Sequence, residues 1–262
     1  MTGAAEPFTR LVVDATGPVG RLRLNRPERL NALDPTTFEE LVRAAQLFDA
    51  APDVRVVVVS GAGRAFCAGF DLTALADARR TPRETADLGR LLAEAVTGMR
   101  AVTVAAVQGA CIGGGVVLVS CCDLRVAAAD ARFALPEAAL GIPLGWGGVP
   151  RLVREIGPAA TKDLVLTCRE VDAEEAHRLG LLNRVVPPAD LGAAADELAH
   201  LVASRPAAVL TATKRQVNAV AEELASTAGA AGDADLLLTS LADPEAAAAR
   251  SRYLSTRRVT YP

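Results

Sequence analysis

Histidine is scarce in this sequence, and its scarcity narrows the chemistry open to the chain. The only two, His177 and His200, lie in Ala- and Leu-rich stretches with a helical pattern, and no Gly-x-Ser-x-Gly turn occurs. A Ser-His-Asp hydrolase is therefore disfavoured. The glycines after Val107 lack the Gly-x-Gly-x-x-Gly spacing of a dinucleotide-binding turn. The five cysteines have no repeating spacing and no histidine nearby, so no metal site is predicted.

Neither sign of charge is in large excess. The 262 residues carry a net charge of -3, and 23% of them are charged, so no polyanion-binding face is indicated and nucleic acid is not an expected partner. The chain begins without a basic segment followed by an apolar one, and its cysteine count is odd. We expect buried free thiols and a cytoplasmic location.

A membrane-spanning helix is also disfavoured. Residues 101–122 carry no formal charge and are about long enough to cross a bilayer. However, three glycines interrupt this stretch, and β-branched residues precede them. The pattern predicts a buried strand, a turn and a buried helix instead.

The first two thirds of the chain alternate strand-like and helix-like segments. We predict strands at Val19–Leu24, at Val54–Ser60 and at Val102–Val107. We predict helices at Thr36–Ala50 and Glu84–Met99, and another that opens at Gly113–Gly115. From Pro158 onward the pattern is almost wholly helical, with a turn at Pro187-Pro188 and a last helix starting at Asp243-Pro244. The chain is thus an α/β protein with a helical C-terminal part.

Two features together suggest enolate chemistry. Gly113–Gly115 supply backbone amides without side chains, and Glu137 supplies an isolated carboxyl group in an apolar surrounding. Amides of this kind stabilise a developing oxyanion, and a carboxylate beside them can move a proton.

Seven segments resemble the enoyl-CoA hydratase/isomerase (crotonase) family, in the family's order and at its spacing. They are Asn25–Asp34, Ser60–Leu72, Ala106–Gly115, Cys122–Ala127, Leu135–Pro143, Gly145–Leu152 and Ala173–Pro187. The resemblance implies a crotonase-like spiral of ββα units over residues 1–190, with the acyl-CoA site, and a helical oligomerisation region over residues 191–262. It also implies a homotrimer, or a hexamer made of two trimers. No separate cofactor is expected, because coenzyme A is part of the substrate.

The resemblance also assigns roles to residues. The N-H groups of Ala68 and Gly114 would form the oxyanion hole, and Glu137 would be the catalytic acid/base. Further contacts with CoA or the acyl group are implied for Arg29, Leu30, Arg64, Phe66, Gly69, Phe70, Asp71 and Trp146. Arg29 is equally compatible with a solvated surface charge. Ordering of its own loop is the favoured role for Asp71, and packing is favoured over closure of the acyl pocket for Trp146. Residues 73–98 would govern acyl specificity.

One position departs from the family's hydratases. They use two glutamates to hold and activate water, but Val117 stands where the second is expected. Loss of one such acid lowers catalysis by about 10²- to 10⁴-fold. A single glutamate suffices for Δ3-Δ2 enoyl-CoA isomerisation, which we therefore expect. Two alternatives stay open: a hydratase or other lyase with a substitute second acid, and a non-catalytic acyl-CoA binder.

Overall fold

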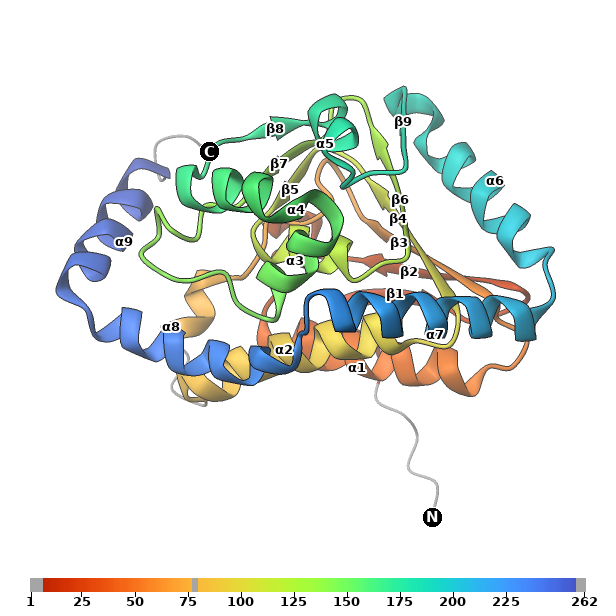
Figure 1. The fold of residues 1–262 in the computed structure, drawn as a ribbon, viewed down its shortest axis with the longest axis horizontal. Coiled ribbons are helices and arrows are strands. Elements are labelled where there is room, and N and C mark those ends of the chain that lie inside the picture. Colours follow the sequence, from red (N-terminus) through yellow and green to blue (C-terminus); the bar gives the residue numbers. More distant parts are fainter. Residues whose placement is uncertain (1–6, 77–79, 258–262) are drawn as a thin grey trace, which may run out of the picture.

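The computed structural model describes residues 7–76 and 80–257, which form a mixed α/β body with helices at its C-terminal end (Figure 1). The strands are β1 Leu11–Asp14, β2 Val19–Leu24, β3 Val56–Gly61, β4 Val102–Val107, β5 Ala110–Ile112, β6 Leu124–Ala128, β7 Arg132–Ala134, β8 Val171–Asp172 and β9 Arg184–Val186. The helices are α1 Pro35–Ala50, α2 Pro82–Gly98, α3 Gly114–Ser120, α4 Gly148–Thr167, α5 Ala173–Leu179, α6 Leu191–Ala203, α7 Ala207–Leu224, α8 Asp233–Ala242 and α9 Pro244–Arg257.

The larger sheet has the order β1-β2-β3-β4-β6-β9, and all its pairs are parallel except β1 with β2. Its central strands are apolar on both faces because helices cover both. Val57 and Val59 of β3 pack in the core that contains α1 and α2, whereas Val56 and Val58 pack in the core that contains α6. This explains why β3 and β4 appear in the sequence as continuous apolar runs.

Two strands of the smaller sheet, which has the order β5-β7-β8, lie directly before the glycine run and shortly before Glu137 in the chain. Strand β5 pairs in parallel with β7 and ends one residue before Gly113. Strand β7 ends at Ala134, shortly before Glu137. Because β5 and β7 are parallel, the glycine run and the segment that carries Glu137 leave the sheet at the same end.

Helix boundaries follow local sequence signals. Asp34 caps α1, because its carboxylate accepts the Thr37 N-H at 2.8 Å, and Pro35 occupies the first turn. Asp243 similarly accepts the Ala246 N-H at the start of α9. In α4, Gly157 has non-helical angles directly before Pro158, so this helix is kinked there.

The predicted strands and helices are present to within about two residues at each end. Val19–Leu24 and Val102–Val107 are confirmed at both boundaries. The expectation of an almost wholly helical chain after Pro158 misses two strands: β8 belongs to the smaller sheet and β9 to the larger one. Both strands are short, and their pairing partners lie far away in the sequence.

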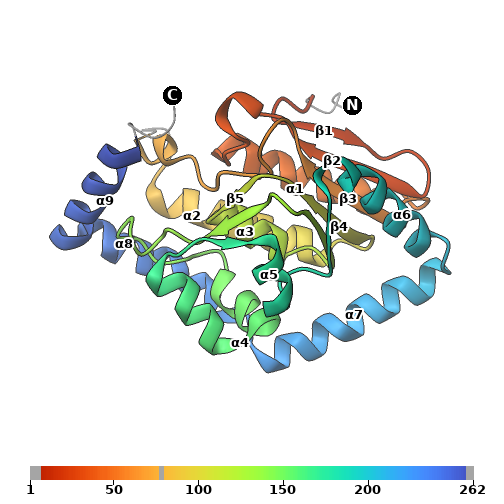
Figure 2. The same cartoon turned by 90° about the horizontal axis from the view of Figure 1, so that it is seen from above.

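The C-terminal helices are distributed over the molecule. Helix α6 covers one face of the larger sheet. Both views place α8 and α9 at the opposite end of the molecule from α6 (Figures 1 and 2). Within the described part of the chain, no helix combines the length and apolar character needed to cross a bilayer. Residues 101–122 form β4, β5 and α3 instead.

Candidate active site

Two neighbouring segments bring the predicted oxyanion-hole residues together. The chain around Cys67 runs beside the chain around Cys111: Cys67 N-H donates to the Ala110 carbonyl at 3.1 Å, and Ile112 N-H donates to the Cys67 carbonyl at 2.9 Å. Glycine is required on both sides of this contact. A Cβ atom on Gly69 would lie 2.6 Å from the Ile112 carbonyl oxygen, and one on Gly115 would lie 2.7 Å from the Cys67 carbonyl oxygen.

The two N-H groups predicted to form the oxyanion hole differ in whether they already have a hydrogen-bond acceptor. The Gly114 N-H, at the start of α3, donates to no acceptor among the residues that the structure describes. The Ala68 N-H donates to the Leu30 carbonyl at 2.9 Å. Leu30 has a left-handed backbone with φ of 50°. The structure therefore does not contain the predicted pair of free amides: the Leu30 carbonyl occupies one of them.

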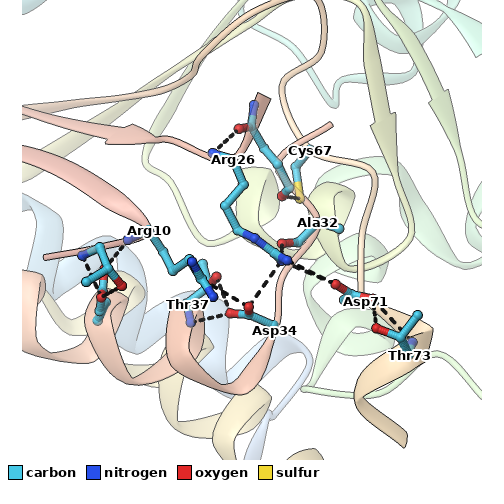
Figure 3. Close-up of polar contacts among 11 residues, drawn as sticks. Arg10, Arg26, Ala32, Asp34, Thr37, Cys67, Asp71 and Thr73 are labelled. Atoms are coloured by element: carbon cyan, nitrogen blue, oxygen red, sulfur yellow. Dashed lines mark hydrogen bonds and ion pairs between the residues drawn. The ribbon is translucent and has the colours of Figure 1, made fainter. Parts of the chain in front are cut away.

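A polar network fixes the segment that carries Leu30 (Figure 3). The Arg26 guanidinium donates to the Ala32 carbonyl at 2.6 Å and forms ion pairs with Asp34 and Asp71, both at 3.3 Å. Asp71 also accepts from the N-H and hydroxyl of Thr73. The Asp71 carboxylate is thus engaged in holding its own loop.

The other residues predicted to contact CoA or the acyl group have different degrees of exposure. Arg29 and Arg64 are exposed, whereas Leu30 and Phe70 are half-buried. The Phe66 ring is wholly buried in the main core. The Phe66 backbone is buried too, and its N-H donates to the Gln108 carbonyl at 2.8 Å, so the structure gives no surface of Phe66 to a ligand.

Glu137 lies beside the glycine run, as its predicted role requires. A Cβ atom on Gly113 would lie 2.4 Å from Glu137 Oε1, so the carboxyl group is in close contact with the Gly113 backbone. Glu137 is 8% exposed, and its Oε2 atom is buried with no hydrogen-bond partner within the described ranges 7–76 and 80–257. Burial raises the pKa of Glu137 to about 7. A carboxyl group in this state can both accept and donate a proton near neutral pH.

Glu137 is one wall of a largely apolar pocket with an empty volume of about 640 Å³, its open mouth included. Other walls come from α2, α3, α8 and the loop before α4. The lining residues are Phe70, Thr85, Ala86, Gly114, Val117, Glu137, Ile142, Pro143, Leu144, Gly145, Trp146, Asp233 and Leu237. Val117, which the sequence resemblance places where family hydratases have their second acid, is 1% exposed and lines this pocket.

Asp233 is a pocket residue that the sequence did not predict. It is the first residue of α8, and its Oδ2 atom accepts the Gly147 N-H at 2.8 Å. Burial raises the pKa of Asp233 from its ordinary value. Nothing local in the sequence around Asp233 marks it as a pocket residue, since α8 reaches the pocket only through tertiary packing.

Thr85 and Ala86 of α2 also line the pocket. They belong to the region expected to govern acyl specificity, of which residues 77–79 lie outside the described residues.

The cysteines are free, and four of them are buried as expected, while Cys168 is half-buried. Cys67 lies next to the proposed oxyanion segment, but its sulfur accepts from the Gly69 N-H at 3.3 Å, and burial raises its pKa to about 12. Such a thiol stays protonated and packs as a small apolar group.

Comparison with known proteins connects this geometry to one family. The family model described as enoyl-CoA hydratase/isomerase matches residues 14–262. A Mycobacterium tuberculosis protein named "Probable enoyl-CoA hydratase" is 39% identical over 215 residues, covering 80% of this chain and 82% of the relative. The peroxisomal Delta(3,5)-Delta(2,4)-dienoyl-CoA isomerase of Arabidopsis thaliana is 38% identical over 180 residues, covering 64% and 65%.

The fold has equally clear counterparts. The crystal structure of an enoyl-CoA hydratase/isomerase from Xanthobacter autotrophicus superposes with a TM-score of 0.86 at 28% identity, covering 98% of this chain and all of the other. The predicted crotonase-like α/β fold is thereby confirmed.

Proposed function

The chain belongs to the enoyl-CoA hydratase/isomerase family, and from that premise we propose that it moves the double bond of a 3-enoyl-CoA thioester to the 2-position. Glu137 is the single acid/base in this proposal. One observation carries it: a buried carboxyl group, with one unpartnered oxygen and a pKa of about 7, lines the same pocket as Gly114. The residue expected at the second acid position, Val117, lines this pocket too.

The proposed reaction needs one proton and no added water. The Glu137 carboxylate takes a proton from C2, and the electrons of the C2-H bond move into the thioester to give a dienolate. The resulting carboxylic acid returns the proton to C4, the C2-C3 double bond forms, and the carboxylate is regenerated. A pKa near the working pH suits a group that must both take and give a proton.

The dienolate oxygen would be held by the N-H groups of Gly114 and Ala68. The Gly114 N-H is available, whereas the Ala68 N-H must exchange the Leu30 carbonyl for the thioester oxygen. The exchange replaces one N-H···O bond by another, and the new bond strengthens as negative charge develops. Glycine at position 114 makes room for the Trp146 ring, because a Cβ atom there would lie 2.3 Å from Trp146 Cζ3.

We further propose that the CoA part binds along the segments that carry Leu30 and Asp71. Arg29 and Arg64 are exposed cations near these segments and suit the phosphate groups of CoA. Gly69 adjoins the pantetheine in this arrangement. Asp71 contributes indirectly, because its bond to Arg26 fixes the loop.

Hydration is the second candidate, and Asp233 is the observation that favours it. Asp233 lines the same pocket as Glu137 and has a raised pKa, so it could act as the second acid that Val117 cannot supply. The protein named "Probable enoyl-CoA hydratase" among the relatives is consistent with this reaction. However, one Asp233 oxygen already holds the Gly147 N-H.

Incubation of the enzyme with 2-enoyl-CoA and with 3-enoyl-CoA separates the candidates. We expect migration of the double bond from 3-enoyl-CoA to exceed hydration of 2-enoyl-CoA. Asp233→Asn is the matched variant, because the amide oxygen can still accept the Gly147 N-H but cannot transfer a proton. Hydration that is fast in the wild type and abolished in Asp233→Asn would establish the second candidate. Absence of both reactions, with acyl-CoA still bound, would identify a non-catalytic binder.

The proposal includes assembly and location. We propose a homotrimer or a hexamer in the cytoplasm. Exposed apolar residues along α7, namely Val209, Val217, Val220 and Leu224, support self-association of the C-terminal helices.

A further inference from the structure

Aromatic residues are scarce in this chain, yet three of them form one cluster, and two of these, Phe70 and Trp146, line the pocket. The chain has six phenylalanines, two tyrosines and one tryptophan. The rings of Phe38 and Phe70 are stacked with centroids 6.1 Å apart. The Trp146 ring meets both nearly at right angles, with centroid distances of 5.1 Å to Phe38 and 6.2 Å to Phe70. Such contacts hold an aromatic ring in a defined orientation.

Glycines on two helices make room for the Trp146 ring. A Cβ atom on Gly89 of α2 would lie 2.1 Å from Trp146 Nε1, and one on Gly114 of α3 would lie 2.3 Å from Trp146 Cζ3. Neither approach is possible for a residue with a side chain. The indole therefore lies between α2 and α3, in direct contact with both backbones.

The backbone of the Trp146 turn is held from both sides. Trp146 has φ of 61° and Gly147 has φ of 69°, and a left-handed tryptophan persists only where its surroundings fix it. Asp233 accepts the Gly147 N-H. The Arg151 guanidinium donates to the carbonyls of Trp146 and Gly147 at 3.2 Å and 3.1 Å. The indole is thus fixed in the pocket by its backbone as well as by its ring contacts.

We propose that Trp146 ends the acyl pocket and restricts the enzyme to short acyl chains. The indole covers the backbone of Gly114, whose N-H would hold the thioester oxygen, so it lies near the first carbons of the acyl chain. This inference rests on the proposed function for the position of the thioester. Each methylene that a pocket admits or excludes changes discrimination by roughly 10- to 200-fold, so an indole at this place excludes chains of more than a few carbons.

Saturated acyl-CoA thioesters test the pocket without any reaction. Calorimetric titration of butyryl-CoA, octanoyl-CoA and dodecanoyl-CoA should show affinity falling at least tenfold from the shortest to the longest in the wild type. Trp146→Ala should raise dodecanoyl-CoA affinity by tenfold or more, and Trp146→Phe should lie between the two. Equal binding of all three thioesters by the wild type, or an unchanged length profile in Trp146→Ala, would overturn the proposal.

The fluorescence of the protein provides a second readout, because Trp146 is the only tryptophan. Butyryl-CoA should change the emission, and CoA without an acyl group should change it much less. Equal responses to both ligands would show that the acyl group does not reach the indole, and would contradict the proposal.

Failure of this proposal can be distinguished from failure of the proposed function. If no enoyl-CoA is turned over but Trp146→Ala still broadens the length profile of binding, only the proposed reaction fails. If 3-enoyl-CoA is isomerised but Trp146→Ala leaves the dependence of affinity on acyl-chain length unchanged, only the proposed role of Trp146 is wrong.

Discussion

A single carboxyl group carries the proposed chemistry, and its substitution is the most direct test at the residue scale. Glu137→Gln keeps the shape of the side chain but cannot accept the C2 proton. We expect the kcat for 3-enoyl-CoA isomerisation to fall by about two orders of magnitude or more, with acyl-CoA affinity nearly unchanged. Steady-state kinetics and calorimetry together check this. Equal isomerisation rates in the wild type and the variant would show that another group moves the proton.

The same residue should make stability depend on pH. Burial raises the pKa of Glu137 from its ordinary 4.5 to about 7, so the folded state holds a proton that the unfolded state has lost over this range. Stability contributed by the protonated group is complete below about pH 4.5 and is lost as the pH rises through 7. The full loss is about 3 kcal/mol. Denaturant unfolding should therefore show Glu137→Gln gaining stability relative to the wild type from about pH 4.5 to about pH 8.

Val117 offers the complementary test at the position of the missing acid. Val117→Glu should raise hydration of 2-enoyl-CoA, because the new carboxyl group would face the pocket that Glu137 lines. The site is crowded, since Val117 is 1% exposed and a Cβ atom on Gly148 would lie 2.8 Å from its Cγ2 atom. Circular dichroism must first show that the variant is folded. A folded variant with unchanged hydration would mean that the water site is incomplete in other respects too.

At the scale of elements, the packing of α2 against Trp146 predicts that Gly89→Ala lowers the free energy of unfolding, whereas Gly→Ala in a helix interior usually raises it. In a helix interior, Gly→Ala stabilises by about 0.5–1 kcal/mol. Gly89→Ala should instead destabilise the wild type by about 1–3 kcal/mol, because the new methyl group would overlap the indole. In a Trp146→Ala background the same change should be neutral or stabilising. Unfolding free energies of the wild type, the two single variants and the double variant form the cycle. Gly192→Ala, at an open position on α6, is the control.

Elements that are apolar on both faces could be predicted from the sequence, and elements defined by distant pairing could not. Strand β4 is buried on both faces along its whole length, so its apolar run marks it at both ends. Strands β8 and β9 have two and three residues, too few for an alternating pattern to stand out. Their pairing is decided by tertiary contacts, which override the helical pattern around them.

The residues of the candidate site also fall into those predicted from local motifs and those placed only by tertiary packing. Glu137 and the glycine run were predicted because their chemistry is local to two motifs. The hydrogen bond from the Ala68 N-H to the Leu30 carbonyl depends on the left-handed backbone of Leu30. No sequence pattern predicts this backbone conformation. Asp233 reaches the pocket only because α8 packs beside the Gly147 turn, 86 residues earlier in the chain.

At the scale of the whole molecule, most of the exposed large apolar residues among the described ones lie on helices, and Val12 of β1 is an exception. Lys214 ties α7 to the body, because its ammonium group donates to the Ala101 carbonyl at 2.9 Å and pairs with Asp123 at 2.8 Å. Further along the same helix, Val217 is 60% exposed and Leu224 is 80% exposed. An anchored helix with uncovered apolar residues is typical of a surface that another subunit covers.

The last prediction concerns this surface. Replacing both Val217 and Val220 by glutamate should dissociate the protein, because paired subunits would have to bury uncompensated charge. Light scattering coupled to size exclusion should give three or six times 27.1 kDa for the wild type and a smaller mass for the variant. Val12→Glu, at an exposed valine of β1, is the control. The dissociated variant should still bind butyryl-CoA, since a single chain supplies every wall of the described pocket. A monomeric wild type would refute the proposed assembly, and loss of binding on dissociation would show that a neighbouring subunit completes the site.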